Sequence, residues 1–297
     1  MTIEQVSALG IVTAAVVYLL ALMAHSAEWA SARGLAAGPG DATSQNRSAS
    51  VEMWGRLGLN LTVIAAIAHA TGVLARGVAA DRAPWGNMYE FVTASLLFVV
   101  VTYLVLAFWK GARWLGLLTT LLLSVGNGLA ATVLYVAVGP LVPALHSVWF
   151  VIHIVAACIS AAGFNVGAAA SILYLLKVRA EANGSTGGYL ARIPGPRELD
   201  TFAYRAHAFA FPIWTFTIAA GSIWAEFAWG RYWGWDPKET WSLVTWVVYA
   251  AYLHARATAG WRGRSAAWIA IVGVATFWFN FIGINLLVSG LHSYAGI

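Results

Sequence analysis

The sequence contains few charged residues. Asp, Glu, Lys and Arg make up 10% of its 297 residues, whereas hydrophobic residues make up 60%. Soluble globular proteins carry about 25% charged residues, so this composition excludes an ordinary soluble domain. Long apolar runs take the place of the missing charge, and such a chain belongs in a lipid bilayer.

Cysteine is nearly absent, since Cys158 is the only one. One cysteine can form neither an internal disulfide nor a Cys-Xaa-Xaa-Cys pair, which excludes a thioredoxin-like reductant and a c-type cytochrome. We predict that Cys158 is a small apolar packing residue. The sequence also lacks an internal repeat and a Gly-rich phosphate motif with its Lys and Ser or Thr.

Eight apolar stretches are long enough to cross a hydrocarbon core of about 30 Å, which needs about 20 residues per helix. They run approximately over 6 to 25, 57 to 75, 91 to 109, 114 to 135, 147 to 176, 207 to 225, 238 to 257 and 266 to 288. The first is followed by Glu28 and Trp29 rather than by a secretory cleavage site, so we expect it to stay as a helix. The predicted fold is all-α, a single polytopic membrane bundle of about eight transmembrane helices over 1 to 297.

The distribution of Lys and Arg predicts the orientation. With the N-terminus outside, the external segments hold four of the 17 basic residues, namely Arg76, Arg82, Arg231 and Lys238. This asymmetry satisfies the positive-inside rule, so we expect both termini outside. We predict that the Gly-, Ser- and Pro-rich segments 34 to 50 and 181 to 198 are cytoplasmic linkers that carry no catalytic or binding residues. A net charge of +5 in a membrane chain is no sign of nucleic-acid binding.

One segment stands out chemically, "WGRYWGWDPKETW" at 229 to 241. Asp236, Pro237 and Glu239 have the form of a helix start, with Asp at the N-cap, Pro next and Glu closing a capping box. We predict an external tryptophan-rich loop over 226 to 241. Its aromatic residues, with the nearby Trp224, are a candidate ligand surface. They are Trp224, Trp229, Tyr232, Trp233, Trp235 and Trp241.

Indoles beside cations suit a large flat apolar ligand that carries carboxylates, and haem fits that description. Arg231 and Lys238 are the cations of the segment and the candidate propionate partners. Loop solubility, or hydrogen bonding at a helix end for Lys238, would explain them equally well. An aromatic belt at the membrane interface is the alternative for the tryptophans. Asp236 and Glu239 are expected to support the loop through the cap.

Haem iron requires ligands, and histidine is the usual choice. Of the seven histidines, His153 and His292 are predicted at the external level of the tryptophan loop. His254 follows Pro237 by 17 residues, which places it roughly 25 Å along the helix, toward the cytoplasmic side. A buried histidine is more often structural than a ligand, and His254 could be an interfacial residue beside Arg256. The external pair flanking one aromatic segment favours ligation.

These residues match a known pattern. The tryptophan segment, preceded by "FPIWTFTIAAGSIWAE" and followed by "YLHAR", resembles the tryptophan-rich WWD motif of the CcsA/ResC cytochrome c biogenesis family of system II, called CcsB in some actinobacteria. "PWGNMYEF" at 84 to 91, "SVWFVIH" at 147 to 153 and "GLHSYA" near the C-terminus extend the resemblance over about 60 to 295. It implies that His153 and His292 are external haem ligands and that His254 is the intramembrane histidine. The family pattern has no firm counterpart of His69, His146 or His207. It also leaves open the roles of Asn87, Tyr89 and Glu90.

The implied function is export and presentation of haem b, bound as cargo, and its covalent attachment to apocytochrome c at a Cys-Xaa-Xaa-Cys-His segment. The family implies a location in the cytoplasmic membrane and a CcsB/ResB-type membrane partner. Thiol-reducing proteins are expected as indirect partners, because they keep the apocytochrome thiols reduced. Whether the chain counts as an enzyme depends on its membrane partner. The alternatives are a system I type haem chaperone, a b-type di-haem electron-transfer subunit and a secondary transporter. The last should show broken helices or paired repeats.

Overall fold

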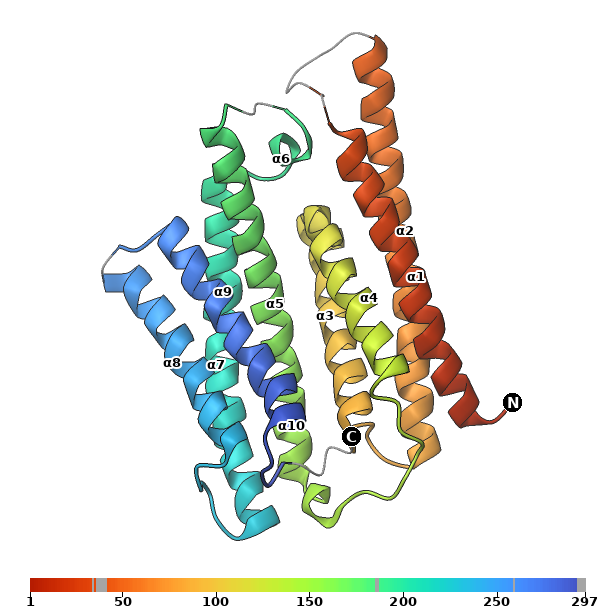
Figure 1. Ribbon diagram of the computed structural model, residues 1–297, viewed down its shortest axis with the longest axis vertical. Helices are drawn as coiled ribbons and strands as arrows, with labels where there is room; N and C mark the ends of the chain where they lie inside the picture. Colours follow the sequence, from red (N-terminus) through yellow and green to blue (C-terminus); the bar gives the residue numbers. More distant parts are fainter. Residues whose placement is uncertain (34, 36–41, 185–186, 259, 293–297) are drawn as a thin grey trace.

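The computed structural model describes residues 1–33, 35, 42–184, 187–258 and 260–292, with side chains of the second helix from Asn46 onward. Its helices pack into one elongated bundle (Figure 1). The long ones are α1 (Ile3–Ser31), α2 (Ala42–Ala80), α3 (Met88–Lys110), α4 (Gly116–Thr132), α5 (Val148–Ala182), α7 (Pro196–Trp229), α8 (Pro237–Thr258) and α9 (Arg264–Trp278). No strand occurs among the described residues, so the prediction of an all-α fold is confirmed.

Shorter elements connect these helices. The 3-10 turns η1 (Ala112–Leu115) and η2 (Pro143–Leu145) precede α4 and α5, and α6 (Tyr189–Arg192) lies between α5 and α7. After α9 the chain continues through a π-helical turn, η3 (Phe279–Gly283), into α10 (Ile284–Leu287). The last described residues, up to His292, therefore follow directly on a helix that has come back across the bundle.

Within the described part of the chain, seven helical segments are long and apolar enough to cross a membrane, by length and composition. They include every long helix except α8, whose 22 residues carry Glu239 in the first turn and Arg256 in the last. Side chains on α1 such as Leu9, Val16 and Leu19 are about half exposed, which suits contact with lipid. The chain is a multi-pass membrane protein, and the predicted polytopic bundle of about eight helices is confirmed.

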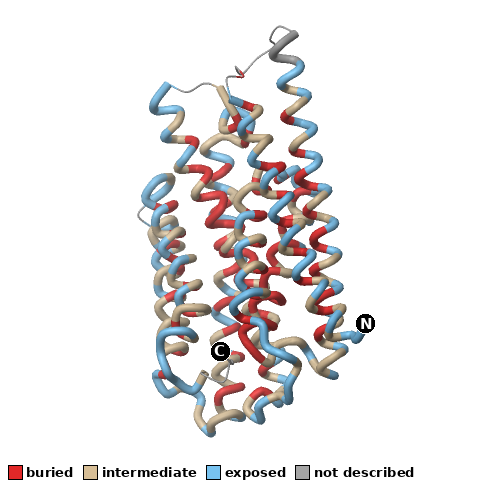
Figure 2. Tube along the Cα trace, turned by 45° about the vertical axis from the view of Figure 1, so that its right-hand side comes forward, coloured by how far each residue is buried: buried red, intermediate tan, exposed pale blue. Residues whose placement is uncertain are grey.

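Close helix packing in this bundle uses small residues, as is usual in membranes. α1 and α2 run side by side on one edge of the bundle (Figure 1). A Cβ atom on Gly10 of α1 would lie 2.8 Å from the Cα atom of Gly72 in α2, so the pair requires glycine there. Buried residues lie between the helices and exposed ones on the outer surface (Figure 2).

Helix boundaries differ from the predicted ones at three places. α2 extends over 42 to 50, the second half of the predicted first linker, and α6 lies inside the second. Residues 34, 36–41 and 185–186 of these linkers lie outside the described residues. α7 runs to Trp229 and α8 begins at Pro237, so the non-helical part of the tryptophan segment covers 230 to 236. Gly230 ends α7 because it adopts a left-handed conformation (φ 68°) that other residues rarely adopt.

Candidate functional site at the tryptophan end of the bundle

A cavity opens at the end of the bundle that carries the connection between α7 and α8. The empty space inside it and at its open mouth amounts to about 1100 Å³. Helices α5, α7 and α8 and the segment from η3 to His292 contribute to its walls. Most of the lining side chains are apolar or aromatic, and His153 and His292 both face the space. The cavity thus has the lining of a binding site for an apolar or aromatic ligand.

His153 is held in one orientation by α7. Its Nδ1 lies 2.8 Å from the backbone oxygen of Thr217. A carbonyl can only accept, so Nδ1 carries the hydrogen and the other ring nitrogen, Nε2, is the basic one. Gly221, one turn further along α7, makes room for the ring, because a Cβ there would lie 2.6 Å from Nδ1.

His292 is held by a carboxylate instead. Its Nδ1 lies 2.8 Å from Oδ1 of Asp236, which precedes α8. Burial lowers the pKa of His292, and the hydrogen bond to Asp236 opposes that shift. Burial alone would raise the pKa of Asp236, but hydrogen bonds from His292 and from the Leu291 N–H lower it to about 2. A neutral imidazole beside an ionised carboxylate is the protonation state that a metal ligand needs.

Trp224 brings the two histidines into one site. Its indole centroid lies 5.8 Å from the imidazole of His153 and 5.6 Å from that of His292. Its Nε1–H donates to the oxygen of Ala144 at 2.7 Å, which fixes the indole. Trp229 adds a second indole, 4.9 Å from His292. Residues that are 139 positions apart in the sequence therefore meet around the same aromatic group.

The other aromatic candidates divide into two groups. Tyr232 and Trp233 line the cavity, as Trp224 and Trp229 do. Trp235 is 68% exposed and adopts φ 58°, and its ring contacts Trp233 edge-on. Trp241 packs against Phe279 with ring centroids 4.3 Å apart. The structure places the last two outside the lining of the cavity.

The two candidate cations also differ in position. Lys238 lines the cavity, and its Nζ donates to Oδ1 of Asn285 at 2.9 Å. Arg231 is absent from the lining, and its guanidinium packs over Gly234 with Nη1 3.7 Å from Oε2 of Glu239. Only Lys238 of this pair faces the place that a ligand would occupy.

Glu239 and Asp236 shape the loop as the capping pattern predicts. Oε2 of Glu239 accepts from the backbone N–H groups of Gly234 and Asp236, at 2.8 and 3.0 Å. Asp236 in turn accepts from the N–H of Lys238 at 3.2 Å. This reciprocal arrangement starts α8 and explains why the helix begins where the sequence predicts.

His254 lies apart from this site. It is exposed on α8, toward the end opposite the tryptophan loop. Nearby, Arg256 donates to both carboxylate oxygens of Asp200 at 2.6 and 2.9 Å, which fastens this end of α8 to α7. Cys158 is buried on α5, five residues after His153, and forms part of the cavity wall.

Sequence reasoning missed two asparagines in the cavity, Asn280 and Asn285. Oδ1 of Asn280 is buried and has no hydrogen-bond partner among the described residues. Both lie in the last apolar stretch, and amide side chains inside membrane helices are rare enough to be a signal for a functional site. The described residues contain no group of three or more His, Cys, Asp or Glu side chains that could hold a metal ion alone.

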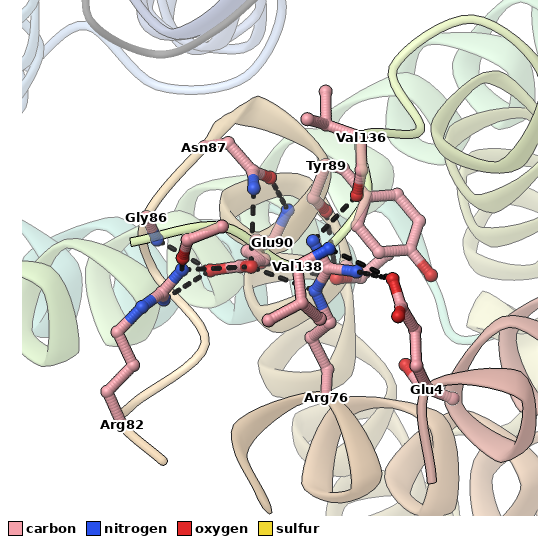
Figure 3. Close-up of polar contacts among 12 residues, drawn as sticks. Glu4, Arg76, Arg82, Gly86, Asn87, Tyr89, Glu90, Val136 and Val138 are labelled. Carbon is pink, nitrogen blue, oxygen red and sulfur yellow. Dashed lines mark hydrogen bonds and ion pairs between the residues drawn. The ribbon is translucent and has the colours of Figure 1, made fainter. Parts of the chain in front are cut away.

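A second buried polar cluster lies beside this site, around Glu90 in "PWGNMYEF" (Figure 3). Its carboxylate accepts from Nε of Arg76 at 2.9 Å and from Nη1 of Arg82 at 2.7 Å. The N–H of Gly86 and the amide of Asn87 also donate to it, at 2.6 and 3.2 Å. Arg76 further approaches Glu4 of α1 at 3.7 Å. We expect this cluster to join α1, α2 and α3.

The fold and the site define a class. This is a multi-pass helical membrane protein with a cavity at one end of the bundle, in which two histidines and several indoles gather around one space.

Comparison with known proteins identifies the family. Residues 85–292 match the family described as "Cytochrome C assembly protein". The chain is 32% identical to "Cytochrome c biogenesis protein CcsA" of Synechococcus sp. (strain JA-2-3B'a(2-13)), over 83% of this chain and 85% of the relative. It is 33% identical to the protein of that name from Microcystis aeruginosa, over 82% and 89%. The chain therefore belongs to the cytochrome c assembly family and acts in cytochrome c biogenesis.

A solved structure shares the fold. The protein titled "Cytochrome c Heme Lyase CcmF" superposes with a TM-score of 0.66 at 18% identity, over 96% of this chain and 50% of its own length. This chain thus spans about half of that protein. None of these findings favours a di-haem electron-transfer subunit or a small-solute transporter.

Proposed function

We propose that the cavity at the tryptophan end binds haem b as cargo and presents it for covalent attachment to apocytochrome c. The observation that carries this proposal is the meeting of His153 and His292 on the indole of Trp224 inside one large apolar cavity. Family membership supports it, because assembly of cytochrome c requires that haem be held and delivered.

The residues in the cavity suit a porphyrin. Both imidazoles have their Nδ1 atoms engaged by protein acceptors, so Nε2 is the nitrogen suited to iron. Trp229 and Trp233 offer flat apolar surface, and the amino group of Lys238 is placed at the cavity to pair with a propionate. The buried oxygen of Asn280 is a polar group that a ligand or a water molecule could satisfy.

The bond-making chemistry belongs to cargo and substrate. Each thiol of a Cys-Xaa-Xaa-Cys-His segment adds across one haem vinyl group, so that a C–S bond forms, the thiol hydrogen goes to the neighbouring carbon and nothing leaves. Those thiols must arrive reduced, and this chain, with one buried cysteine, cannot reduce them. Its contribution is to position the haem and to exclude water from it.

We assign His254 to a second haem site, on the cytoplasmic side of the membrane. Its exposure on α8 allows a CcsB/ResB-type membrane partner to pack against it and to complete a second haem site. Haem made in the cytoplasm would then pass from His254 toward His153 and His292. We assign the chain to the cytoplasmic membrane with the tryptophan end outside, as the distribution of Lys and Arg indicates. Together with its partner the chain forms a cytochrome c synthase.

The test is expression with and without the partner in a host that lacks its own cytochrome c maturation. Covalent haem on a reporter cytochrome and the absorption spectrum of the purified complex are measured. We expect His153→Gly and His292→Gly each to lose the spectrum of the wild-type complex and to regain it with added imidazole. His146→Gly, an exposed histidine outside the cavity, is the matched control. A colourless wild-type complex, or unchanged spectra in both variants, would refute the proposal.

A further inference from the structure

Asp236 joins the tryptophan loop to the segment after α10, because both oxygens of its carboxylate accept hydrogen bonds from that segment. Oδ1 accepts from His292 at 2.8 Å, and Oδ2 accepts from the N–H of Leu291 at 2.7 Å. The side chain is only 4% exposed. A Cβ on Gly290 would lie 2.7 Å from Oδ2, so glycine is needed for this approach. The carboxylate thus fixes both the ring of His292 and the backbone that carries it.

The two histidines differ in the partner that holds Nδ1. His153 donates to the backbone oxygen of Thr217, whereas His292 donates to the side-chain carboxylate of Asp236. A carboxylate partner orients a ligating imidazole and increases the basicity of its other nitrogen more than a carbonyl does. Nε2 of His292 should therefore donate its electron pair to a metal more strongly than Nε2 of His153 does.

We propose that Asp236 is a positioning residue that makes His292 the stronger of two unequal ligands, and that ligand exchange during haem release takes place at His153. This inference rests on the proposed function. An incoming imidazole, such as that of the histidine in a Cys-Xaa-Xaa-Cys-His segment, displaces the more weakly held ligand. His292 then keeps the haem on the protein until both thioethers have formed.

The geometry also explains how a histidine outside a helix can be the retained ligand. His153 lies within the long helix α5, whereas His292 follows α10 by five residues. Without a tether, the ordering of the chain around His292 would cost conformational entropy when a ligand binds. Asp236 supplies the tether, and it is itself held by Glu239, which accepts from the Asp236 N–H. The loop and the ligand are thereby ordered together.

The experiment compares haem affinity of the full-length chain, in complex with its partner, in single and double variants. We expect His153→Gly, which leaves His292, to retain haem better than His292→Gly. Adding Asp236→Asn should weaken haem binding by His153→Gly about 10- to 100-fold, the usual cost of losing such a partner. In the His292→Gly background the same change should have little effect, because Asp236 then has no imidazole to act through.

Glu239→Gln is the matched control. It removes the other loop carboxylate, which holds backbone N–H groups but does not contact His292 in the described residues. We expect this change to affect both single-histidine backgrounds equally, because the side-chain oxygen of Gln still accepts from the Gly234 and Asp236 N–H groups and so keeps Asp236 in place. Equal losses from Asp236→Asn in both backgrounds would instead make Asp236 a structural residue and overturn the inference. Better retention by His292→Gly than by His153→Gly would also overturn it.

A measurement without haem separates this inference from the proposed function. ¹⁵N NMR of histidine-labelled protein should show His292 protonated at Nδ1, and Asp236→Ala should reduce this preference whereas Asp236→Asn, which keeps an acceptor, should preserve it. If His292 shows no preference for Nδ1 in the wild-type protein, the inference fails even when haem binds. If the preference is present but the wild-type complex takes up no haem, the proposed function fails and the exchange order fails with it.

Discussion

Two buried polar clusters lie at the same end of the bundle, and they are built differently. Around Glu90, two guanidinium groups, an amide and a backbone N–H all point at one carboxylate, and Arg82 also borders a separate pocket that it shares with His146 and Phe150. Around His153 and His292, the polar groups line an open space. Polar groups that satisfy one another stabilise a fold, whereas polar groups arranged around a space are suited to a ligand.

The difference has a physical reason in the charges. Glu90 and Arg76 are almost fully buried and carry formal charge, so each needs the other to offset its desolvation. Neutral imidazoles are less costly to bury, and a single Nδ1 hydrogen bond is enough to orient each ring. The Glu90 cluster also fastens α1 and α2, which lie outside the matched region 85–292, to α3. We infer that the Glu90 cluster stabilises the packing of the whole bundle.

The largest effect on stability is expected from a substitution that disrupts the Glu90 cluster. Glu90→Ala should lower the free energy of unfolding by about 3–5 kcal/mol, because it leaves Arg76 buried without its partner. Thermal unfolding of the detergent-solubilised protein measures this loss. Glu52→Gln, in an ion pair that is 56% exposed at Glu52, should change stability by less than about 1 kcal/mol. Equal effects from the two changes would contradict the structural role of Glu90.

The second prediction expects the opposite result at the cavity, namely a large loss of haem with a small loss of stability. His292→Gly should abolish most haem retention while lowering the stability of the haem-free protein less than Glu90→Ala does, because Asp236 keeps its hydrogen bonds from the N–H groups of Lys238 and Leu291. Haem content and unfolding midpoint are measured on the same preparation. A fall in stability as large as that of Glu90→Ala would show that the two clusters do not differ in the way we describe.

A smaller effect distinguishes the two cations of the tryptophan segment. Lys238→Gln should weaken haem binding about 10-fold or more, because a hydrogen bond to a charged group contributes about 1.5–3 kcal/mol. Arg231→Gln should have a weaker effect, since its guanidinium faces Glu239 and Gly234 and not the cavity. Absorbance titration with haem measures both. The opposite ranking would mean that propionates extend past Lys238 to the loop surface.

The smallest effect concerns the unpartnered oxygen of Asn280. Asn280→Leu should raise the stability of the haem-free protein by about 1 kcal/mol, because it removes a buried acceptor that has no hydrogen bond in the described residues. Unfolding in the presence of haem is the companion measurement. If Asn280 contacts the cargo, the gain in stability should disappear when haem is bound. Destabilisation of the haem-free protein would show that a water molecule already satisfies this oxygen.

Much of this protein could be predicted from residue order alone, because the relevant physics is local. Apolar length determines which segments cross a membrane, and the helical bundle followed from it. The start of α8 at Asp236 and Pro237 was also predicted correctly, since a cap involves residues three apart. The sequence predicted a tryptophan-rich segment over 226 to 241, and its non-helical part covers 230 to 236, because α7 runs to Trp229 and α8 begins at Pro237.

What could not be foreseen depends on packing between distant segments. No local pattern shows that Asp236 meets His292 or that Arg231 faces Glu239 while Lys238 faces the cavity. Those outcomes follow from how α7, α8 and the segment after α10 converge. The sequence determined, through hydrophobicity and capping, that this is a membrane bundle with an aromatic segment between two helices. Which side chains share the cavity depends on the packed helices, because burial and hydrogen-bond geometry exist only once the helices are assembled.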